Sequence, residues 1–275
     1  MRMNRLVLAR GTASAALIAV LCLSFCAQAS EQDSWQVLQK AAAAARALSY
    51  KGIFVCQTGK QTKSVEITHM YDGQNEFARN VILDGSPREV LSQSGNVVIY
   101  NPRNEKIIIE KRRGQNMFPA VLPMNLDSVK QSYSLRADGD ERVAGRQAQV
   151  LVLLPKDGLR YSYRFWIDTE YGLLLKSVML NNRNEVMESI GFNQVSLMST
   201  VALDWFKTKI DHNKNYVMEN EQEVVADDGA TADWSIRVLP AGYRKVDQVM
   251  RKVPGKHGAV THVVFSDGLA SVSLF

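Results

Sequence analysis

Residues 158–195, GLRYSYRFWIDTEYGLLLKSVMLNNRNEVMESIGFNQV, contain three strand-length apolar patterns joined by two short polar turns. Alternate residues of a strand share one face of a sheet. The apolar face of the first pattern carries Tyr161, Tyr163, Phe165 and Ile167, and its polar face carries Arg160, Ser162, Arg164 and Asp168. We therefore expect a β-meander within a curved antiparallel sheet, with one apolar face and one largely solvated face. The apolar face suits a sheet that covers a helix or holds an apolar ligand.

The first 29 residues have the features of a secretory signal peptide. Three arginines precede the apolar run 15–25, and Ala27-Gln28-Ala29 gives the small-x-small pattern of a cleavage site. We predict cleavage after Ala29 and export of the mature chain. The apolar run is about half the roughly 20 residues that a membrane-spanning helix needs. Cys26 follows the bulky Phe25, which disfavours a lipid-attachment site.

Net charge limits the kinds of partner that the mature chain can bind, and cysteine content limits its disulfides. The formal charge is +5, but the predicted signal peptide holds three arginines and no acidic residue, so the mature chain carries +2 and is a poor match for nucleic acid. Cleavage also removes Cys22 and Cys26. Only Cys56 remains, so no intramolecular disulfide can form.

Catalytic and metal-binding patterns are weak. Cys56 has His69 as its nearest candidate base but no orienting carboxylate, so we predict a small buried apolar residue rather than a nucleophile. The histidines are too scattered to predict a zinc site. Residues 138–141, DGDE, lack the ligand spacing of an EF-hand, and we predict a hairpin turn there.

Strand-like segments follow one helix at intervals of about ten residues. Asp33 or Ser34 can cap a helix over 33–48, in which the alanine run 41–45 supplies high helix propensity. The expected strands are 51–58, 63–71, 76–83, 87–93, 96–100, 105–111, 132–138, 146–154, 159–167, 173–180 and 185–194. Their regular spacing predicts a barrel or a large curved sheet.

An apolar loop lies between the sixth and seventh expected strands. Its two prolines oppose regular structure, and a short helix is expected after it, near 125–130. It is either a lid over a hydrophobic cavity or an ordinary buried crossover. The lid residues would be Met117, Phe118, Val121, Leu122 and Met124.

Composition changes sharply after a further short helix expected near 197–206. Residues 211–233 contain seven acidic residues and one lysine, and residues 234–275 carry a net charge of +4. We therefore predict a large domain over 30–210, an acidic linker over 211–233 and a small domain over 234–275. The small domain should have strands near 234–239, 243–250 and 260–265, and the chain stops at Phe275 inside a further strand-like pattern.

Four sequence blocks resemble the RseB/MucB family of periplasmic regulators of the envelope-stress sigma-E pathway. They are residues 84–90 (DGSPREV), 157–170 (DGLRYSYRFWIDTE), 239–243 (LPAGY) and 265–269 (FSDGL). The resemblance implies a mainly β fold with a few helices, in which a large unclosed β-barrel, similar to that of LolA-type lipoprotein carriers, precedes a smaller β-rich domain. Because the family continues beyond the position of Phe275, we expect the small domain to be incomplete.

The same resemblance implies regulation by binding in the periplasm, without enzymatic activity, cofactor or metal. Such regulators bind the periplasmic domain of a transmembrane anti-sigma factor and protect it from proteolysis, and lipid or lipopolysaccharide releases them. In the mucoid branch of the family this switch governs alginate overproduction. The alternative is a periplasmic lipoprotein or lipid carrier, which has no evident need for a second domain. The sequence leaves homodimer formation and the identity of the lipid open.

Two groups of basic residues are candidates for contact with an anionic ligand or with the partner. Lys111, Arg112 and Arg113 end an expected strand beside the apolar loop, where they would suit lipid phosphates, although a solvated turn is the alternative. The second group comprises Arg244, Lys245, Arg251 and Lys252. These residues could meet an acidic segment of the anti-sigma factor, or could simply keep the surface soluble.

Overall fold

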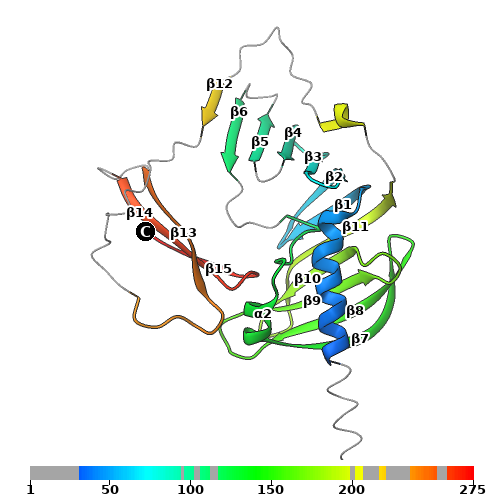
Figure 1. The fold of residues 1–275 in the computed structure, drawn as a ribbon, viewed down its shortest axis with the longest axis vertical. Helices are drawn as coiled ribbons and strands as arrows, with labels where there is room; N and C mark the ends of the chain where they lie inside the picture. Colours follow the sequence, from blue (N-terminus) through cyan, green and yellow to red (C-terminus); the bar gives the residue numbers. More distant parts are fainter. Residues whose placement is uncertain are drawn as a thin grey trace, which may run out of the picture.

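Two β-sheets of unequal size make up most of the protein (Figure 1). This computed structural model describes residues 31–93, 96–101, 106–111, 117–198, 202–206, 217–220, 236–252 and 259–275. The predicted signal peptide, Arg112, Arg113 and most of the acidic segment lie outside the described residues.

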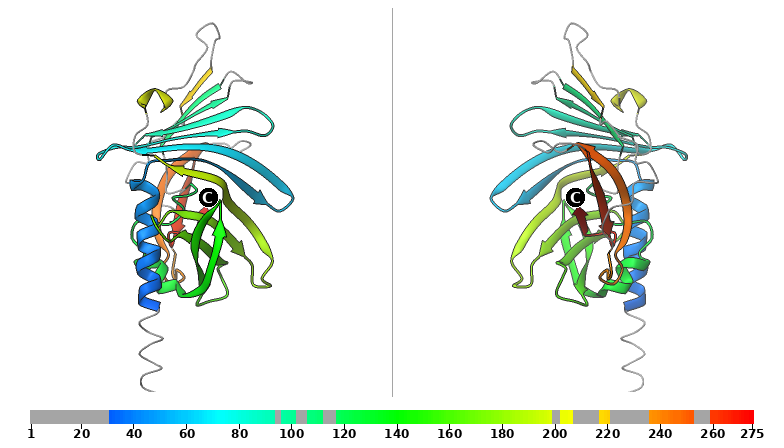
Figure 2. Two further views of the ribbon diagram at one scale, coloured as in Figure 1. Left: turned by 90° about the vertical axis from the view of Figure 1, so that its right-hand side faces the viewer. Right: turned by 90° about the vertical axis from the view of Figure 1, so that its left-hand side faces the viewer.

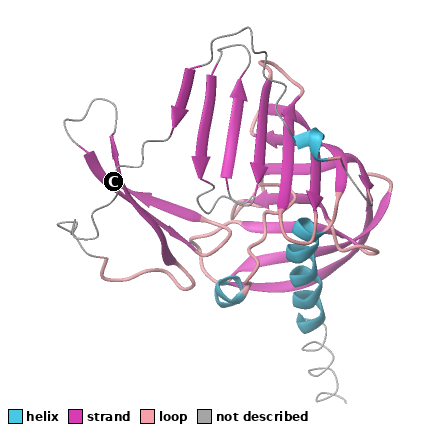
Figure 3. Cartoon of the chain, turned by 45° about the horizontal axis from the view of Figure 1, so that its top comes forward, coloured by secondary structure: helices cyan, strands magenta, loops and turns pink. Residues whose placement is uncertain are grey.

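The large sheet has twelve strands in the order β12-β6-β5-β4-β3-β2-β1-β11-β10-β9-β8-β7. The strands are β1 (Tyr50–Thr58), β2 (Gln61–Tyr71), β3 (Glu76–Ile82), β4 (Arg88–Gln93), β5 (Asn96–Asn101), β6 (Lys106–Lys111), β7 (Tyr133–Val143), β8 (Arg146–Pro155), β9 (Ser162–Asp168), β10 (Leu174–Leu180), β11 (Val186–Leu197) and β12 (Val217–Asn220). The first eleven confirm the expected strands. Since β12 and β7 are the two ends of the row, the sheet is unclosed (Figure 3).

One strand pair joins the two halves of the large sheet. Strands β1 to β6 and strands β7 to β11 each follow one another as antiparallel neighbours, and β1 pairs with β11. The register shifts between Ile53 and Phe54, which pair with Gln194 and Phe192, so β11 has one extra residue, Asn193, at this point. At Gly52 a Cβ atom would come 2.5 Å from the backbone oxygen of Gln194, so glycine permits this close approach. Figure 2 shows the strong curvature of the strands on either side of this pair.

The helix over residues 31–47 packs against the half of the sheet formed by β7 to β11 (Figure 1). It confirms the expected helix, but the expected cap is wrong, because Asp33 and Ser34 both lie inside the helix. Leu38, Ala42 and Ala45 have no solvent exposure, because the small alanine side chains let the helix lie close to the sheet. The core beneath it includes Tyr50, Phe54, Leu151, Phe165, Ile167, Leu174 and Phe192. Within the described part of the chain, no helix is both long and apolar enough to span a membrane.

The predicted division of residues 160–168 into an apolar and a solvated face is wrong at several positions. Tyr161, expected on the apolar face, is exposed. Phe165 and Ile167 are buried as expected, but Arg160 and Asp168 are buried too. Asp168 accepts a 2.5 Å hydrogen bond from Nε of Arg146 and caps the following turn by accepting from the backbone of Tyr171. The alternating pattern predicted these charged side chains at the solvated face. They are buried instead, because each has partners that compensate for the loss of water.

The small sheet consists of β13 (Arg244–Lys252), β14 (Ala259–Ser266) and β15 (Ser271–Leu274) in that order. Two of these strands were expected, and β15 forms the strand-like pattern seen at the end of the chain. The strand predicted at 234–239 is wrong for the residues described there, since 236–239 are irregular.

Three shorter features complete the fold. The helix α2 (Asp127–Ser132) and the 3-10 helix η1 (Leu203–Phe206) match the two short helices that were expected. The hairpin turn predicted at residues 138–141 is wrong, because these residues lie within β7 at a register shift between Ala137 and Asp140. Strand β12 was not predicted and pairs in parallel with β6, although its residues fall in the expected linker.

Candidate functional site at the junction of the two sheets

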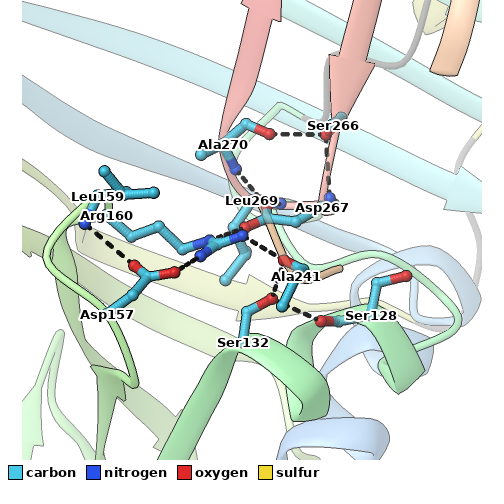
Figure 4. A network of polar contacts seen from close by, with 11 residues as sticks. Ser128, Ser132, Asp157, Leu159, Arg160, Ala241, Ser266, Asp267, Leu269 and Ala270 are labelled. Carbon is cyan, nitrogen blue, oxygen red and sulfur yellow. Dashed lines mark hydrogen bonds and ion pairs between the residues drawn. The ribbon is translucent and has the colours of Figure 1, made fainter. Parts of the chain in front are cut away.

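Arg160 joins the two sheets at their junction (Figure 4). Its Nε atom donates a 2.7 Å hydrogen bond to Asp267, and both side chains are completely excluded from solvent. The same guanidinium also donates to Asp157 and to the backbone oxygen of Ala241. Burial by itself would lower the pKa of Arg160, but the hydrogen bonds to the two carboxylates outweigh it and raise the pKa. A charged arginine therefore holds two segments of the small domain at once.

The turn at Asp267 is shaped by its own carboxylate. Oδ1 of Asp267 accepts hydrogen bonds from the backbone nitrogens of Leu269, at 3.0 Å, and Ala270, at 2.8 Å. Because Oδ2 faces Arg160, one side chain both builds the turn and binds the large domain (Figure 4). Leu269 packs against the core of the large domain.

A second contact lies at the end of α2. The hydroxyl of Ser132 donates a 2.8 Å hydrogen bond to the backbone oxygen of Ala241. The next residue, Gly242, has a φ of +77°, and a Cβ atom there would clash with Ser132 and with the backbone oxygen of Ser128. Glycine is thus required both by the turn and by the close packing on α2.

Tyrosine rings surround the buried charges. The guanidinium carbon of Arg160 lies 4.8 Å from the ring centre of Tyr243, a cation–π contact. Burial is the main cause that raises the pKa values of Tyr133 and Tyr163 above that of a free phenol, and the nearby Asp267 carboxylate adds to it. Both phenols therefore stay neutral, and the charged partners of Arg160 are the carboxylates of Asp157 and Asp267.

The apolar loop lies beside this junction and is packed into the large domain. The ring of Phe118 is 5.1 Å from that of Phe54 and 5.0 Å from that of Phe192, measured between centroids. Phe118 and Leu122 are buried, whereas Met117 and Met124 are exposed and Val121 is half-buried. The phenylalanine and the leucine of the expected lid thus point into the core, and its two methionines lie at the surface.

Comparison with known proteins identifies the family. The model of the MucB/RseB N-terminal domain matches residues 33–210, and that of the MucB/RseB C-terminal domain matches residues 228–275. The chain belongs to the MucB/RseB family. It is similar to the sigma-E factor regulatory protein RseB of Haemophilus influenzae, at 29% identity over 94% of this chain and 81% of the relative. It is also similar to the sigma factor AlgU regulatory protein MucB of Pseudomonas aeruginosa, at 28% identity over 90% and 75% of the two chains.

Solved structures of the MucB/RseB family share the fold. The chain superposes on the complex structure of Pseudomonas aeruginosa MucA/MucB with a TM-score of 0.70 and 28% identity, over 88% of this chain and 78% of that one. These relatives are regulatory proteins and not enzymes, as the sequence blocks implied. Three of the four blocks meet at the junction, since they supply Arg160, Ala241 and Asp267.

The basic residues that the sequence suggested as contacts do not take part in the junction around Arg160 described above. Arg244 and Lys245 begin β13 and are exposed, whereas Arg251 and Lys252 end that strand. Lys111 ends β6, next to residues outside the described chain.

Cys56 and His69 lie at different places on the β1–β2 pair. Cys56 pairs with Lys63 across the β1–β2 hairpin, and His69 pairs with Tyr50. His69 stacks on Tyr50 and contacts the backbone oxygen of Leu48 at 2.7 Å. Among the described residues no group of three potential metal ligands comes together.

The sequence patterns did not single out Arg160, Asp267 or Arg46 as candidate site residues. Arg46, on the helix over 31–47, donates hydrogen bonds of 3.2 and 3.0 Å to the backbone oxygens of Ala120 and Leu122. The available signal was the position of Arg160 and Asp267 inside two of the family blocks.

Proposed function

We propose that this protein is a periplasmic negative regulator of an envelope-stress sigma factor. It binds the periplasmic domain of a transmembrane anti-sigma factor, protects it from proteolysis, and is released by lipid or lipopolysaccharide. The carrying observation is that the chain belongs to the MucB/RseB family over both domains and is similar to a MucB whose complex with MucA is known. The predicted signal peptide supports the periplasmic location.

The apolar loop is our proposed site for the acyl part of the ligand. Phe118 and Leu122 occupy an apolar core position at the edge of the domain, next to exposed methionines. An acyl chain could replace their contacts without exposing polar groups. The proposed contacts for anionic headgroups are Lys111, Arg112 and Arg113. The proposed contacts for the partner are the four basic residues of β13, Arg244, Lys245, Arg251 and Lys252.

The junction favours the regulator over the lipid-carrier alternative. A carrier needs the large domain alone, whereas here the small domain is bound to it through a completely buried ion pair. Release by a ligand further requires that the ligand bind the free regulator more tightly than the complex. A change in how the two domains fit together would supply that difference.

A pull-down of residues 30–275 with the periplasmic domain of the cognate anti-sigma factor tests this proposal. We expect capture that declines as purified lipopolysaccharide is added. The paired change Arg112→Ser and Arg113→Ser should make capture less sensitive to lipopolysaccharide. The control is the paired change Lys60→Ser and Lys63→Ser, which removes the same charge from exposed positions on the β1–β2 hairpin. Absence of capture would overturn partner binding, and capture that is indifferent to the lipid would overturn release.

A further inference from the structure

The segment that contains the apolar loop also supports the small domain. It runs from Met117 through the loop into α2, which ends at Ser132. Pro123 in the loop faces the Asp267 turn, because a Cβ atom on Gly268 would come 2.9 Å from its Cγ. Ser132 at the other end binds the Ala241 backbone oxygen. One short segment therefore contacts both turns that Arg160 holds.

The same segment is fixed on its other side to the N-terminal helix. Arg46 donates to two backbone oxygens of the loop, and Nε2 of Gln39 donates a 2.8 Å hydrogen bond to the backbone oxygen of Met124. The two bonds from Arg46 satisfy carbonyl groups that are partly shielded from water. The loop therefore has few ways to shift unless it moves away from the helix and the small domain together.

We propose that residues 117–132 couple the acyl-chain site to the small domain, so that displacing Phe118 from the core loosens the Asp267 and Ala241 turns. The role of an acyl chain in this coupling rests on the proposed function. The coupling itself is a property of the packing. When Phe118 leaves its contacts with Phe54 and Phe192, Pro123 moves with it, and Gly268 and Leu269 lose the surface on which they pack.

Amide hydrogen exchange on residues 30–275 tests the coupling without any ligand. The nitrogens of Gly268, Leu269 and Ala270 are held by the side chains of Ser266 and Asp267, so their exchange rates report opening of the turn. We expect Phe118→Ala to raise these rates about tenfold more than Ile67→Ala does. Ile67→Ala is the matched control, because Ile67 is equally buried in the core but lies on β2.

Equal rates in the two variants at residues 268–270 would overturn the coupling. If Phe118→Ala does not fold, Phe118→Leu gives the same test, since it keeps most of the apolar volume and still removes the aromatic contacts. A selective rise at 268–270 over the Ile67→Ala control again supports coupling, and no such rise overturns it.

A ligand arm separates this inference from the proposed function. Wild-type protein is mixed with lysophosphatidylglycerol, a single-chain anionic lipid, below its micellar concentration. Faster exchange in both 117–124 and 268–270 supports the coupling, and faster exchange in 117–124 alone overturns it. If the lipid binds without changing exchange in 117–124, the loop is not the acyl site and that part of the proposed function fails, while the variants still decide the coupling.

Discussion

Replacing Arg160 by methionine should detach the small sheet from the large domain. The change leaves the Asp267 carboxylate buried without its cationic partner, and both side chains have no solvent exposure in the native protein. Breaking one side of a buried ion pair costs about 3–5 kcal/mol. At 1.4 kcal/mol for each factor of ten, docking of the small domain should weaken by about two to three and a half orders of magnitude.

Urea unfolding followed by backbone NMR signals of β13 to β15 measures this loss separately from the large sheet. Asp267→Asn provides the second corner of a double-mutant cycle, because asparagine keeps an oxygen for the turn amides but removes the charge. The double variant should therefore lose less than the sum of the two single variants. Arg136→Met, which removes an exposed ion pair with Asp138, should change little. If Arg160→Met were as mild as Arg136→Met, the buried pair would not hold the small domain.

Three further predictions use other features. Gly242→Ala should destabilise the protein more than Gly85→Ala in thermal unfolding. Both glycines have a φ of +77°, which costs an alanine about 1–2 kcal/mol, but only at position 242 would the added Cβ atom also clash, with Ser132 among others. Equal losses of stability in the two variants would contradict the packing argument. Gly52→Ala should lower the free energy of unfolding by about 1–3 kcal/mol, since the added Cβ atom would lie 2.5 Å from a backbone oxygen of β11. An unchanged midpoint of urea unfolding would show that the two strands separate easily. Burial raises the pKa of the Cys56 thiol, so its alkylation by iodoacetamide at pH 8 should be slower in folded than in urea-unfolded protein and should accelerate at higher pH; equal rates would refute the shift.

The strands were predictable because their signal is local. The spacing of strand-like apolar segments located all eleven strands from β1 to β11, and alanine content located the helix, although not its first residue. The same reasoning failed where pairing is non-local. Strand β12 is four residues long within an acidic segment and is defined by its partner β6. Residues 236–239 have strand-like composition, but they pair with none of the strands in the described part of the chain.

The junction was less accessible to pattern reasoning. Arg160 and Asp267 are 107 residues apart, and alternation placed Arg160 on a solvated face because a lone arginine is normally exposed. The misplacement has a physical cause, since each charge is buried only because the other is present. Resemblance to a family drew attention to both stretches without showing that they meet. The apolar loop was located correctly, but its attachment to Arg46 depends on backbone oxygens, which leave no trace in the sequence.

The single connection between the two halves of the large sheet has a consequence for how the chain folds. Each half consists of neighbouring hairpins, which close short loops and form quickly. Pairing of β1 with β11, by contrast, brings Tyr50 beside Leu197 and closes most of the domain in one step. The entropy of that closure makes it the expected slow step of folding. Until it occurs, the unpaired edges of β1 and β11 are both exposed, so a folding chain is most prone to aggregate at this stage.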